Sequence, residues 1–196
     1  TCKKAIEERF TKYTSSLGLI ELRQEIATHY QKKYGVQVDP EQVIVTEGTS
    51  PAMLLTFAVL LSSGDHIIVS NPHYPCYPAF IQFLRGQPNY VRVKEEDGFQ
   101  YRPGAIRKAI SKKTRAIVIN SPSNPTGNLL SDAAMKEIAD LAGRNRWIVS
   151  DEIYHGLSYG GAEHTALEYA PGAFVLNGFS KAYAMTGWRL GYLIYP

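Results

Sequence analysis

The chain has 196 residues, 44% hydrophobic and 20% charged, which is the composition of an ordinary globular protein with one domain. Its 21 basic and 18 acidic residues give a formal net charge of +3 and form no run of like charge, so neither nucleic acid nor a membrane surface is predicted as a partner. The longest apolar stretch, residues 52–61, is far shorter than the roughly 20 residues that a membrane span needs. Cys2 and Cys76 form neither a CxxC pair nor a secreted disulfide pattern, which favours free thiols and a cytoplasmic location.

The first predicted element is a helix over residues 18–34, because Leu22, Ile26, Tyr30 and Tyr34 recur every four residues and stripe one helix face. Seven short β-rich runs follow, at residues 43–46, 67–70, 90–93, 116–120, 147–151, 174–177 and 190–195. Helical patterns lie between most of these runs, at residues 50–61, 77–84, 103–110 and 131–142, with Ser50 predicted as the N-cap of the first of the four. Strands that alternate with helices predict an α/β layer fold with a mostly parallel, seven-stranded sheet.

The strand predicted at residues 147–151 runs directly into Asp151. The sequence contains no GxGxxG, GxxxxGK[ST] or HExxH motif and no Cys/His set with zinc spacing, so no nucleotide or metal site is predicted. A carboxylate at the end of a buried strand needs hydrogen-bond donors or a cation, because an unpaired buried charge is costly. Three interpretations of Asp151 are therefore open: it caps a helix, it forms a salt bridge with a basic side chain of the protein, or it faces a protonated heterocyclic nitrogen of a bound molecule.

A lysine, Lys181, follows the strand predicted at residues 174–177, and Arg189 comes eight residues later. Burial and positive neighbours turn a lysine into a nucleophile for Schiff-base chemistry, although most basic residues are solvated surface charges. A second polar site is predicted at the small-residue turn Gly48-Thr49-Ser50, directly before a helix. Free backbone N–H groups and the positive helix end meet there, which favours a bound phosphate.

Six motifs extend these observations along nearly the whole chain. They are Tyr13 with Gly18 and Leu22-Arg23; Thr46-Glu47-Gly48-Thr49-Ser50; Asn71-Pro72-His73-Tyr74; Asn120-Ser121-Pro122-Ser123-Asn124-Pro125-Thr126-Gly127; Ser150-Asp151-Glu152-Ile153-Tyr154; and Ser180-Lys181-Ala182-Tyr183-Ala184-Met185-Thr186-Gly187-Trp188-Arg189-Leu190-Gly191-Tyr192. In this order the motifs resemble those of the class I and II aminotransferases, which are pyridoxal-phosphate (PLP) enzymes of fold type I. Six ordered motifs are far more specific than one of them alone.

The resemblance implies a three-layer α/β/α fold, in which residues 1–196 are the PLP-binding large domain of a longer aminotransferase without its C-terminal small domain. It implies transfer of an amino group between an amino acid and a 2-oxo acid, with PLP as the cofactor. A second arginine that clamps the substrate carboxylate is expected in that C-terminal domain. Two alternatives stay open: a PLP-dependent β-lyase on the same scaffold, and the PLP-sensing domain of a transcription regulator.

The resemblance also implies a role for each matching residue. Lys181 forms the internal aldimine with PLP and later moves the substrate Cα proton. Asp151 pairs with the pyridinium nitrogen of the ring. Tyr154 and Asn124 donate hydrogen bonds to the 3-oxygen of the ring, and Tyr74 stacks on the ring face.

The phosphate group of PLP is expected at Gly48, Thr49, Ser50, Ser180 and Arg189. Tyr13 is expected to reach the phosphate of a neighbouring subunit, which implies a homodimer. Cis peptide bonds are expected at Asn71-Pro72 and Asn124-Pro125.

This sequence departs from many relatives at one position of the phosphate site. Gly178 occupies a place where many relatives have serine, three residues before the lysine, so one hydroxyl group for the phosphate is expected to be missing.

Overall fold

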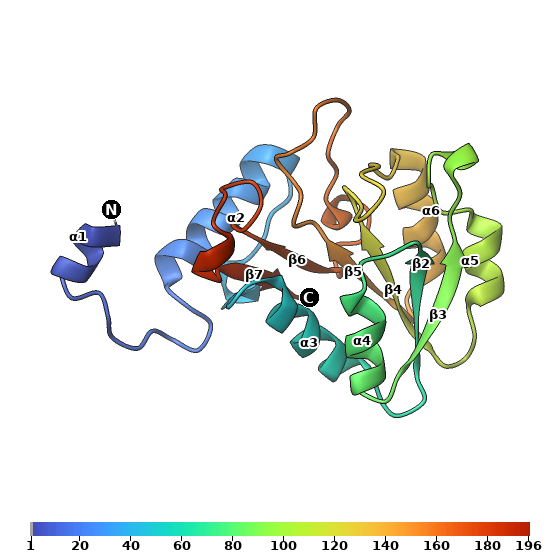
Figure 1. Cartoon of the computed structure of the whole chain (residues 1–196), viewed down its shortest axis with the longest axis horizontal. Helices are drawn as coiled ribbons and strands as arrows, with labels where there is room; N and C mark the ends of the chain where they lie inside the picture. The colour runs from blue at the N-terminus through green and yellow to red at the C-terminus, as the bar shows by residue number, and fades with distance from the viewer. Residues whose placement is uncertain (1) are drawn as a thin grey trace.

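The computed structural model describes residues 2–196, which form one seven-stranded sheet with helices on both faces (Figure 1). The helices are α1 (Cys2–Glu7), α2 (Ile20–Tyr34), α3 (Thr49–Leu60), α4 (Cys76–Phe83), α5 (Pro103–Ala109) and α6 (Asp132–Ala142). The strands are β1 (Val43–Thr46), β2 (His66–Asn71), β3 (Gln87–Arg92), β4 (Thr114–Asn120), β5 (Trp147–Asp151), β6 (Phe174–Gly178) and β7 (Gly191–Ile194). Short 3-10 helices lie at Pro40–Gln42, Glu95–Asp97, Ala166–Glu168 and Thr186–Trp188.

The direction of the strands brings most of their carboxyl ends together. The strand order is β1-β7-β6-β5-β4-β2-β3. The strands from β6 to β3 pair in parallel, whereas β7 pairs antiparallel with both of its neighbours, β6 and β1. Because two antiparallel pairings reverse the direction twice, β1 runs the same way as the parallel strands. The start of β7 therefore lies at the same edge of the sheet as the carboxyl ends of all the other strands.

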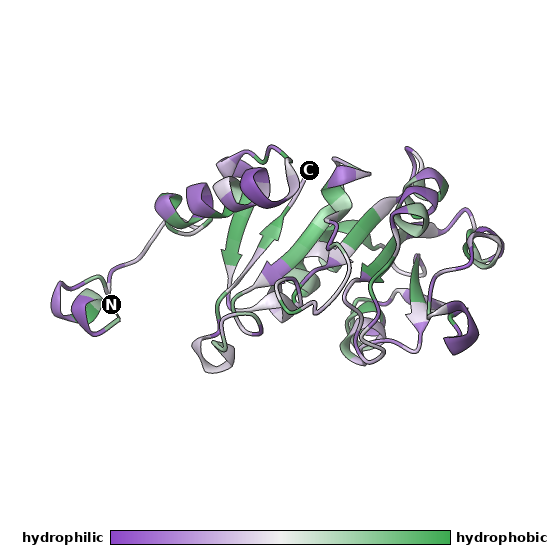
Figure 2. Cartoon of the chain, turned by 90° about the horizontal axis from the view of Figure 1, so that it is seen from above, coloured by the Kyte–Doolittle hydropathy of each residue, from purple (hydrophilic) through white to green (hydrophobic). Residues whose placement is uncertain are grey.

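Alternate residues of the strands pack against opposite layers of helices. In β4, Ile117 and Ile119 belong to the core that includes residues of α2, α5 and α6. Ala116 and Val118 belong to a second core, which includes residues of α3 and α4. Successive side chains of a strand point to opposite faces, so both faces of this sheet are buried. Figure 2 shows the largely apolar strands with helices on both sides of them, which confirms the predicted three-layer α/β/α fold.

Each predicted strand and helix is present, with differences at the ends. β3 begins at Gln87, three residues before the predicted start, and contains Pro88. A proline is tolerated there because β3 is an edge strand with β2 as its partner. Helix α3 begins at Thr49 after Gly48, and no side chain caps it, so the prediction that Ser50 is the N-cap is wrong.

The amino-terminal segment lies apart from the sheet. Helix α1, which was not predicted, and the chain that follows it extend away from the body of the molecule (Figure 1). Across residues 2–196, no helix has both the length and the apolar character that crossing a membrane would need.

Candidate active site

Residues from five loops meet at the edge of the sheet where the strands end. Asn120 at the end of β4 pairs in register with Asp151 at the end of β5, and Asp151 pairs with Leu176 of β6. Lys181 follows β6, and the start of α3 follows β1. The loop that ends in Arg189 leads into β7, which starts at the same edge. Parallel strands thus bring together side chains that are far apart in the sequence.

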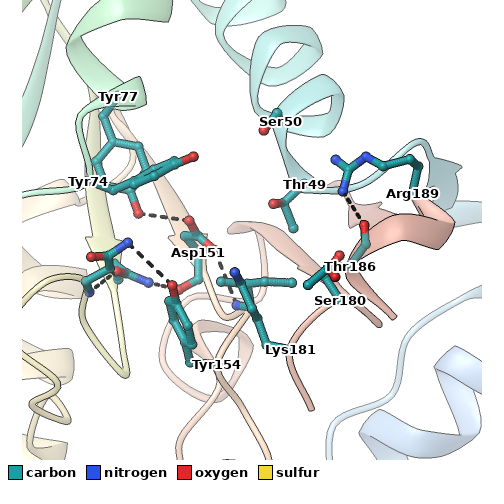
Figure 3. A pocket seen from close by; sticks show the side chains of 13 residues that line it. Thr49, Ser50, Tyr74, Tyr77, Asp151, Tyr154, Ser180, Lys181, Thr186 and Arg189 are labelled. Carbon is teal, nitrogen blue, oxygen red and sulfur yellow. Dashed lines mark hydrogen bonds between the residues drawn. The ribbon is translucent and has the colours of Figure 1, made fainter. Parts of the chain in front are cut away.

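These residues enclose a cavity of about 230 Å³ (Figure 3). It contains every residue predicted for the site except Gly48 and Tyr13. Its lining consists of Thr49, Ser50, Tyr74, Tyr77, Asn120, Asn124, Asp151, Ile153, Tyr154, Ser180, Lys181, Thr186 and Arg189. Asp151 lies at one end of the cavity, Arg189 and the start of α3 lie at the other, and Lys181 lies between them (Figure 3).

Asp151 is a buried carboxylic acid, with 4% of its surface exposed. The Tyr77 hydroxyl donates to Oδ2 at 2.8 Å, and the amide of Ile153 donates to Oδ1 at 3.3 Å. Burial raises the pKa of Asp151 to about 6, although these two hydrogen bonds and the charge of Lys181 act in the opposite direction. The ionised carboxylate is therefore costly in spite of its two hydrogen bonds, and within residues 2–196 no basic side chain forms an ion pair with it.

Tyr154 and Asn124 converge beside Asp151. The Asn124 side-chain amide donates to the Tyr154 hydroxyl at 3.4 Å. Asn120 links the loop that carries Asn124 to the end of β5. The Asn124 backbone amide donates to Asn120 Oδ1 at 2.6 Å, and Asn120 Nδ2 donates to the Asp151 carbonyl at 2.8 Å. Burial and the charge of Asp151 raise the pKa of Tyr154, so its hydroxyl keeps its proton and can donate it to an oxygen.

The start of α3 and Arg189 form the polar end of the cavity. Gly48 has a φ of +94°, which favours glycine, and a Cβ atom there would lie 2.5 Å from Arg189 Nη2. The Arg189 guanidinium donates to the carbonyls of Thr186 at 2.9 Å and Glu47 at 3.3 Å, which holds it beside the helix start. Because Gly48 has no side chain, the Arg189 guanidinium lies next to the free N–H groups at the start of α3. A cation and helix N–H groups together favour a bound anion.

Lys181 lies between the two ends of the cavity. Its Nζ is 5.7 Å from the centre of the Tyr154 ring, which is a cation–π contact. The residue is exposed, so the burial that the sequence argument expected for this lysine is not found.

Tyr74 lines the same cavity. Its ring stands edge-on to the Tyr77 ring, with 5.6 Å between the ring centres. A hydrogen bond with Cys76, burial and nearby acidic groups raise the pKa of Tyr74 to about 12. The peptide bonds at Asn71-Pro72 and Asn124-Pro125 are cis, as predicted, and a third cis bond lies at Ser121-Pro122.

Two positions differ from a complete site. Tyr13 does not line the cavity, and its side chain is fully exposed on the amino-terminal segment. At Gly178 a Cβ atom would lie 2.8 Å from the Cα of Gly191, so β7 passes too close for any side chain. A serine hydroxyl at this position is therefore excluded by packing.

Four further residues of the cavity were missed by the sequence analysis: Tyr77, Asn120, Ile153 and Thr186. Tyr77 is the most important of them, because its hydroxyl contacts Asp151 directly. It lies at the start of a predicted helix and carries no local signal of a polar role. Asn120 could have been predicted as a site residue, because it ends the strand predicted at residues 116–120 and begins the motif at residues 120–127.

Comparisons with known proteins agree with this geometry. The sequence model of the aminotransferase class I and II family matches residues 2–196. A (5-formylfuran-3-yl)methyl phosphate transaminase from Methanocaldococcus jannaschii is 40% identical over 195 residues, which cover 97% of this chain and 50% of that protein. An aspartate aminotransferase from Geobacillus stearothermophilus is 39% identical, with 98% of this chain and 51% of that protein covered. The chain thus spans about half the length of the curated relatives it matches.

Solved structures show the same likeness. The aspartate aminotransferase from Thermus thermophilus with maleate has a TM-score of 0.96 at 38% identity and covers 99% of this chain. An alanine aminotransferase from Pyrococcus furiosus has a TM-score of 0.94 at 39% identity and covers 98% of this chain. This chain covers 51% and 50% of those two structures.

Proposed function

The chain belongs to the class I and II aminotransferase family, and from this premise we propose that the whole protein transfers an amino group between an amino acid and a 2-oxo acid. The family depends on PLP, which is therefore the cofactor of this chain. The observation that carries the proposal is the arrangement of one cavity. A buried carboxylate lies at one end, an anion-binding helix start lies at the other, and an open lysine lies between them.

The residues of the cavity fit PLP at both of its charged groups. Asp151 is a buried carboxylate that forms no ion pair with the basic side chains of residues 2–196, and the pyridine nitrogen of PLP is a cation when protonated. Thr49, Ser50, Ser180 and Arg189 would hold the phosphate at the opposite end, where Gly48 leaves room for the guanidinium. When bound, PLP supplies an aldehyde that takes up amino groups and a ring that withdraws electrons.

Each remaining residue then has a defined task. Lys181 Nζ would hold the cofactor aldehyde and afterwards carry the proton of the substrate Cα. Asp151 would keep the proton on the ring nitrogen, because an ionised carboxylate in a buried place favours a cation beside it. Tyr154 and Asn124 would donate to the oxygen on the ring, since their polar groups already converge. Tyr74 would pack on the face of the ring.

We propose further that this chain is the large domain of a longer, homodimeric enzyme. The coverage of about half of each relative supports the domain assignment. The fully exposed Tyr13, on a segment that extends away from its own cavity, supports a role in the site of a neighbouring subunit. The exposed thiol of Cys2 and the free thiol of Cys76 support a cytoplasmic location.

A titration with PLP tests the central assignment. Wild type, Lys181→Ala and Lys112→Ala would be titrated and then reduced with borohydride, which fixes the cofactor to its lysine. We expect trapping on wild type and on Lys112→Ala, whose changed lysine does not line the cavity, and only non-covalent binding in Lys181→Ala. Trapped cofactor in Lys181→Ala would contradict the assignment.

An assay of the full-length protein tests the reaction itself. A panel of amino acids with 2-oxoglutarate is needed because the relatives carry different substrate names. We expect transamination by the full-length protein, and very poor turnover by residues 1–196 alone, since the substrate-carboxylate clamp is expected elsewhere. Elimination of a β-substituent without amino transfer would favour the β-lyase instead.

A further inference from the structure

Glu152, the neighbour of Asp151, is a charged residue that the proposed chemistry does not use. It has 0% exposure, although it is a carboxylic acid. Successive side chains at the end of a strand point to opposite sides. Asp151 points into the cavity, whereas Glu152 points beneath α2, where it contacts Tyr30.

Three donors share the Oε1 atom of Glu152. The Ser150 hydroxyl donates at 2.9 Å, the Thr165 hydroxyl at 3.0 Å and the backbone amide of Ala166 at 2.9 Å. Ser150 belongs to β5, and the other two belong to the turn that begins the 3-10 helix Ala166–Glu168. One oxygen atom therefore ties β5 to the turn that precedes β6.

The second oxygen and the backbone of Glu152 reach two other elements. The Tyr30 hydroxyl of α2 donates to Oε2 at 3.4 Å, and His155 Nδ1 lies 3.5 Å from the same atom. The backbone amide of Glu152 donates to the carbonyl of Leu176 in β6 at 2.8 Å. Glu152 is thus bonded to α2, to β5, to β6 and to the turn between those two strands.

These contacts lie directly behind the two residues on which the proposed function depends. Asp151 precedes Glu152. In β6, Leu176 is followed by Asn177, whose Oδ1 accepts from the amide of Gly178, the last residue before the loop of Lys181. The position of the β5 end relative to β6 sets how Asp151 faces Lys181, and Glu152 is bonded on both sides of that junction.

Stability alone does not account for a buried carboxylate here. Well-packed apolar residues are often as stabilising as buried charges, and a retained buried charge can serve to select one arrangement. We propose that Glu152 is a positioning residue, whose carboxylate bonds fix the end of β5 against α2 and against the turn that precedes β6, so that Asp151 is held in place relative to Lys181. This inference rests on the proposed function.

The test compares three variants of the full-length protein. Glu152→Ala removes the bonds, and Glu152→Gln keeps an oxygen for the three donors. Glu168→Gln is the matched control, because Glu168 accepts from the amide of Thr165 in the same turn but has no hydrogen bond to β5 or β6 among the described residues. Capture of PLP by Lys181 would be timed by borohydride trapping at saturating PLP. Hydrogen exchange of residues 176–181 would be measured without PLP.

We expect Glu152→Ala to slow capture about 10- to 100-fold, because a small misplacement of reacting groups has effects of this size. Glu152→Gln should restore the rate to within about threefold, and Glu168→Gln should match wild type. Exchange at residues 176–181 should rise in Glu152→Ala alone. Capture and exchange like wild type in a folded Glu152→Ala, or equal losses in Glu168→Gln, would overturn the proposal.

Two further outcomes remain decisive. If Glu152→Ala does not fold, Ser150→Ala replaces it, since alanine removes the hydroxyl that donates to Glu152 Oε1 from β5. Slower capture by Ser150→Ala supports the positioning role, and capture at the wild-type rate overturns it. If wild type itself captures no PLP, the proposed function fails, and the exchange of residues 176–181 alone decides the role of Glu152.

Discussion

Replacement of Asp151 with asparagine should stabilise the cofactor-free protein at neutral pH while it removes the carboxylate from the site. Burial raises the pKa of Asp151 from 3.8 to about 6, against the hydrogen bonds from Tyr77 and Ile153. A difference of about two pKa units means that the ionised carboxylate costs the folded protein about 3 kcal/mol. Asparagine has nearly the same shape without the charge, so the variant avoids this cost.

The expected gain from Asp151→Asn depends on pH in one direction. Because the folded pKa lies above the unfolded value, the protonated acid stabilises the native state below about pH 4, and this contribution is lost as the pH rises through 6. The variant should therefore exceed wild type by about 2 kcal/mol at pH 5 and by about 3 kcal/mol at pH 8. Bound PLP should reverse the order, since Asp151 then has a cationic partner.

Urea unfolding of the cofactor-free protein at the two pH values measures the effect of Asp151→Asn. Asp132→Asn is the matched control, because Asp132 is exposed and a hydrogen bond from Lys136 lowers its pKa, so no gain is expected. An Asp151→Asn variant that is less stable than wild type at pH 8 would refute the burial argument. An equal gain at pH 5 and pH 8 would show that the charge of the carboxylate is not the cause.

Other changes should report on the remaining parts of the chain. Gly48→Ala should lower the free energy of unfolding by about 1–3 kcal/mol and weaken phosphate binding, because Gly48 has a positive φ and its added Cβ would meet Arg189. Thermal unfolding and phosphate titration measure the two effects, and an unchanged melting temperature would contradict the prediction. Tyr13→Phe should sediment as a dimer like wild type but bind PLP about tenfold more weakly. Unchanged PLP binding would show that Tyr13 is not part of the site. Burial raises the pKa of Glu163, but hydrogen bonds led by that from Lys33 outweigh it and lower the pKa to about 2. Glu163→Gln should therefore lose about 1–2 kcal/mol at pH 7, and wild type should lose this contribution as the pH falls from 4.5 toward 2, as acid titration of both proteins would show.

Much of the fold and most of the cavity could be predicted from local sequence. The runs at residues 147–151 and 174–177 predicted β5 to the residue and β6 to within one residue, because strands buried on both faces begin here with three consecutive apolar residues each. Parallel strands end at one edge of a sheet, so Asp151 and Lys181 could be placed near each other once the strands were known. The role of each residue then came from the resemblance to a family.

What only the tertiary structure decided was which groups face one another. The reversal at β7 brings Arg189 against Gly48, and the packing of α4 brings the Tyr77 hydroxyl to Asp151. The packing of α2 over the other face of the sheet buries Glu152, and Lys181 is left exposed, against the expectation for the lysine. The physical reason is that the hydrophobic periodicity of a sequence indicates only whether the side chain at a position is apolar and therefore buried. The partner of a polar group depends instead on which strands pair and which helix covers them, and these contacts join segments that are distant in the sequence.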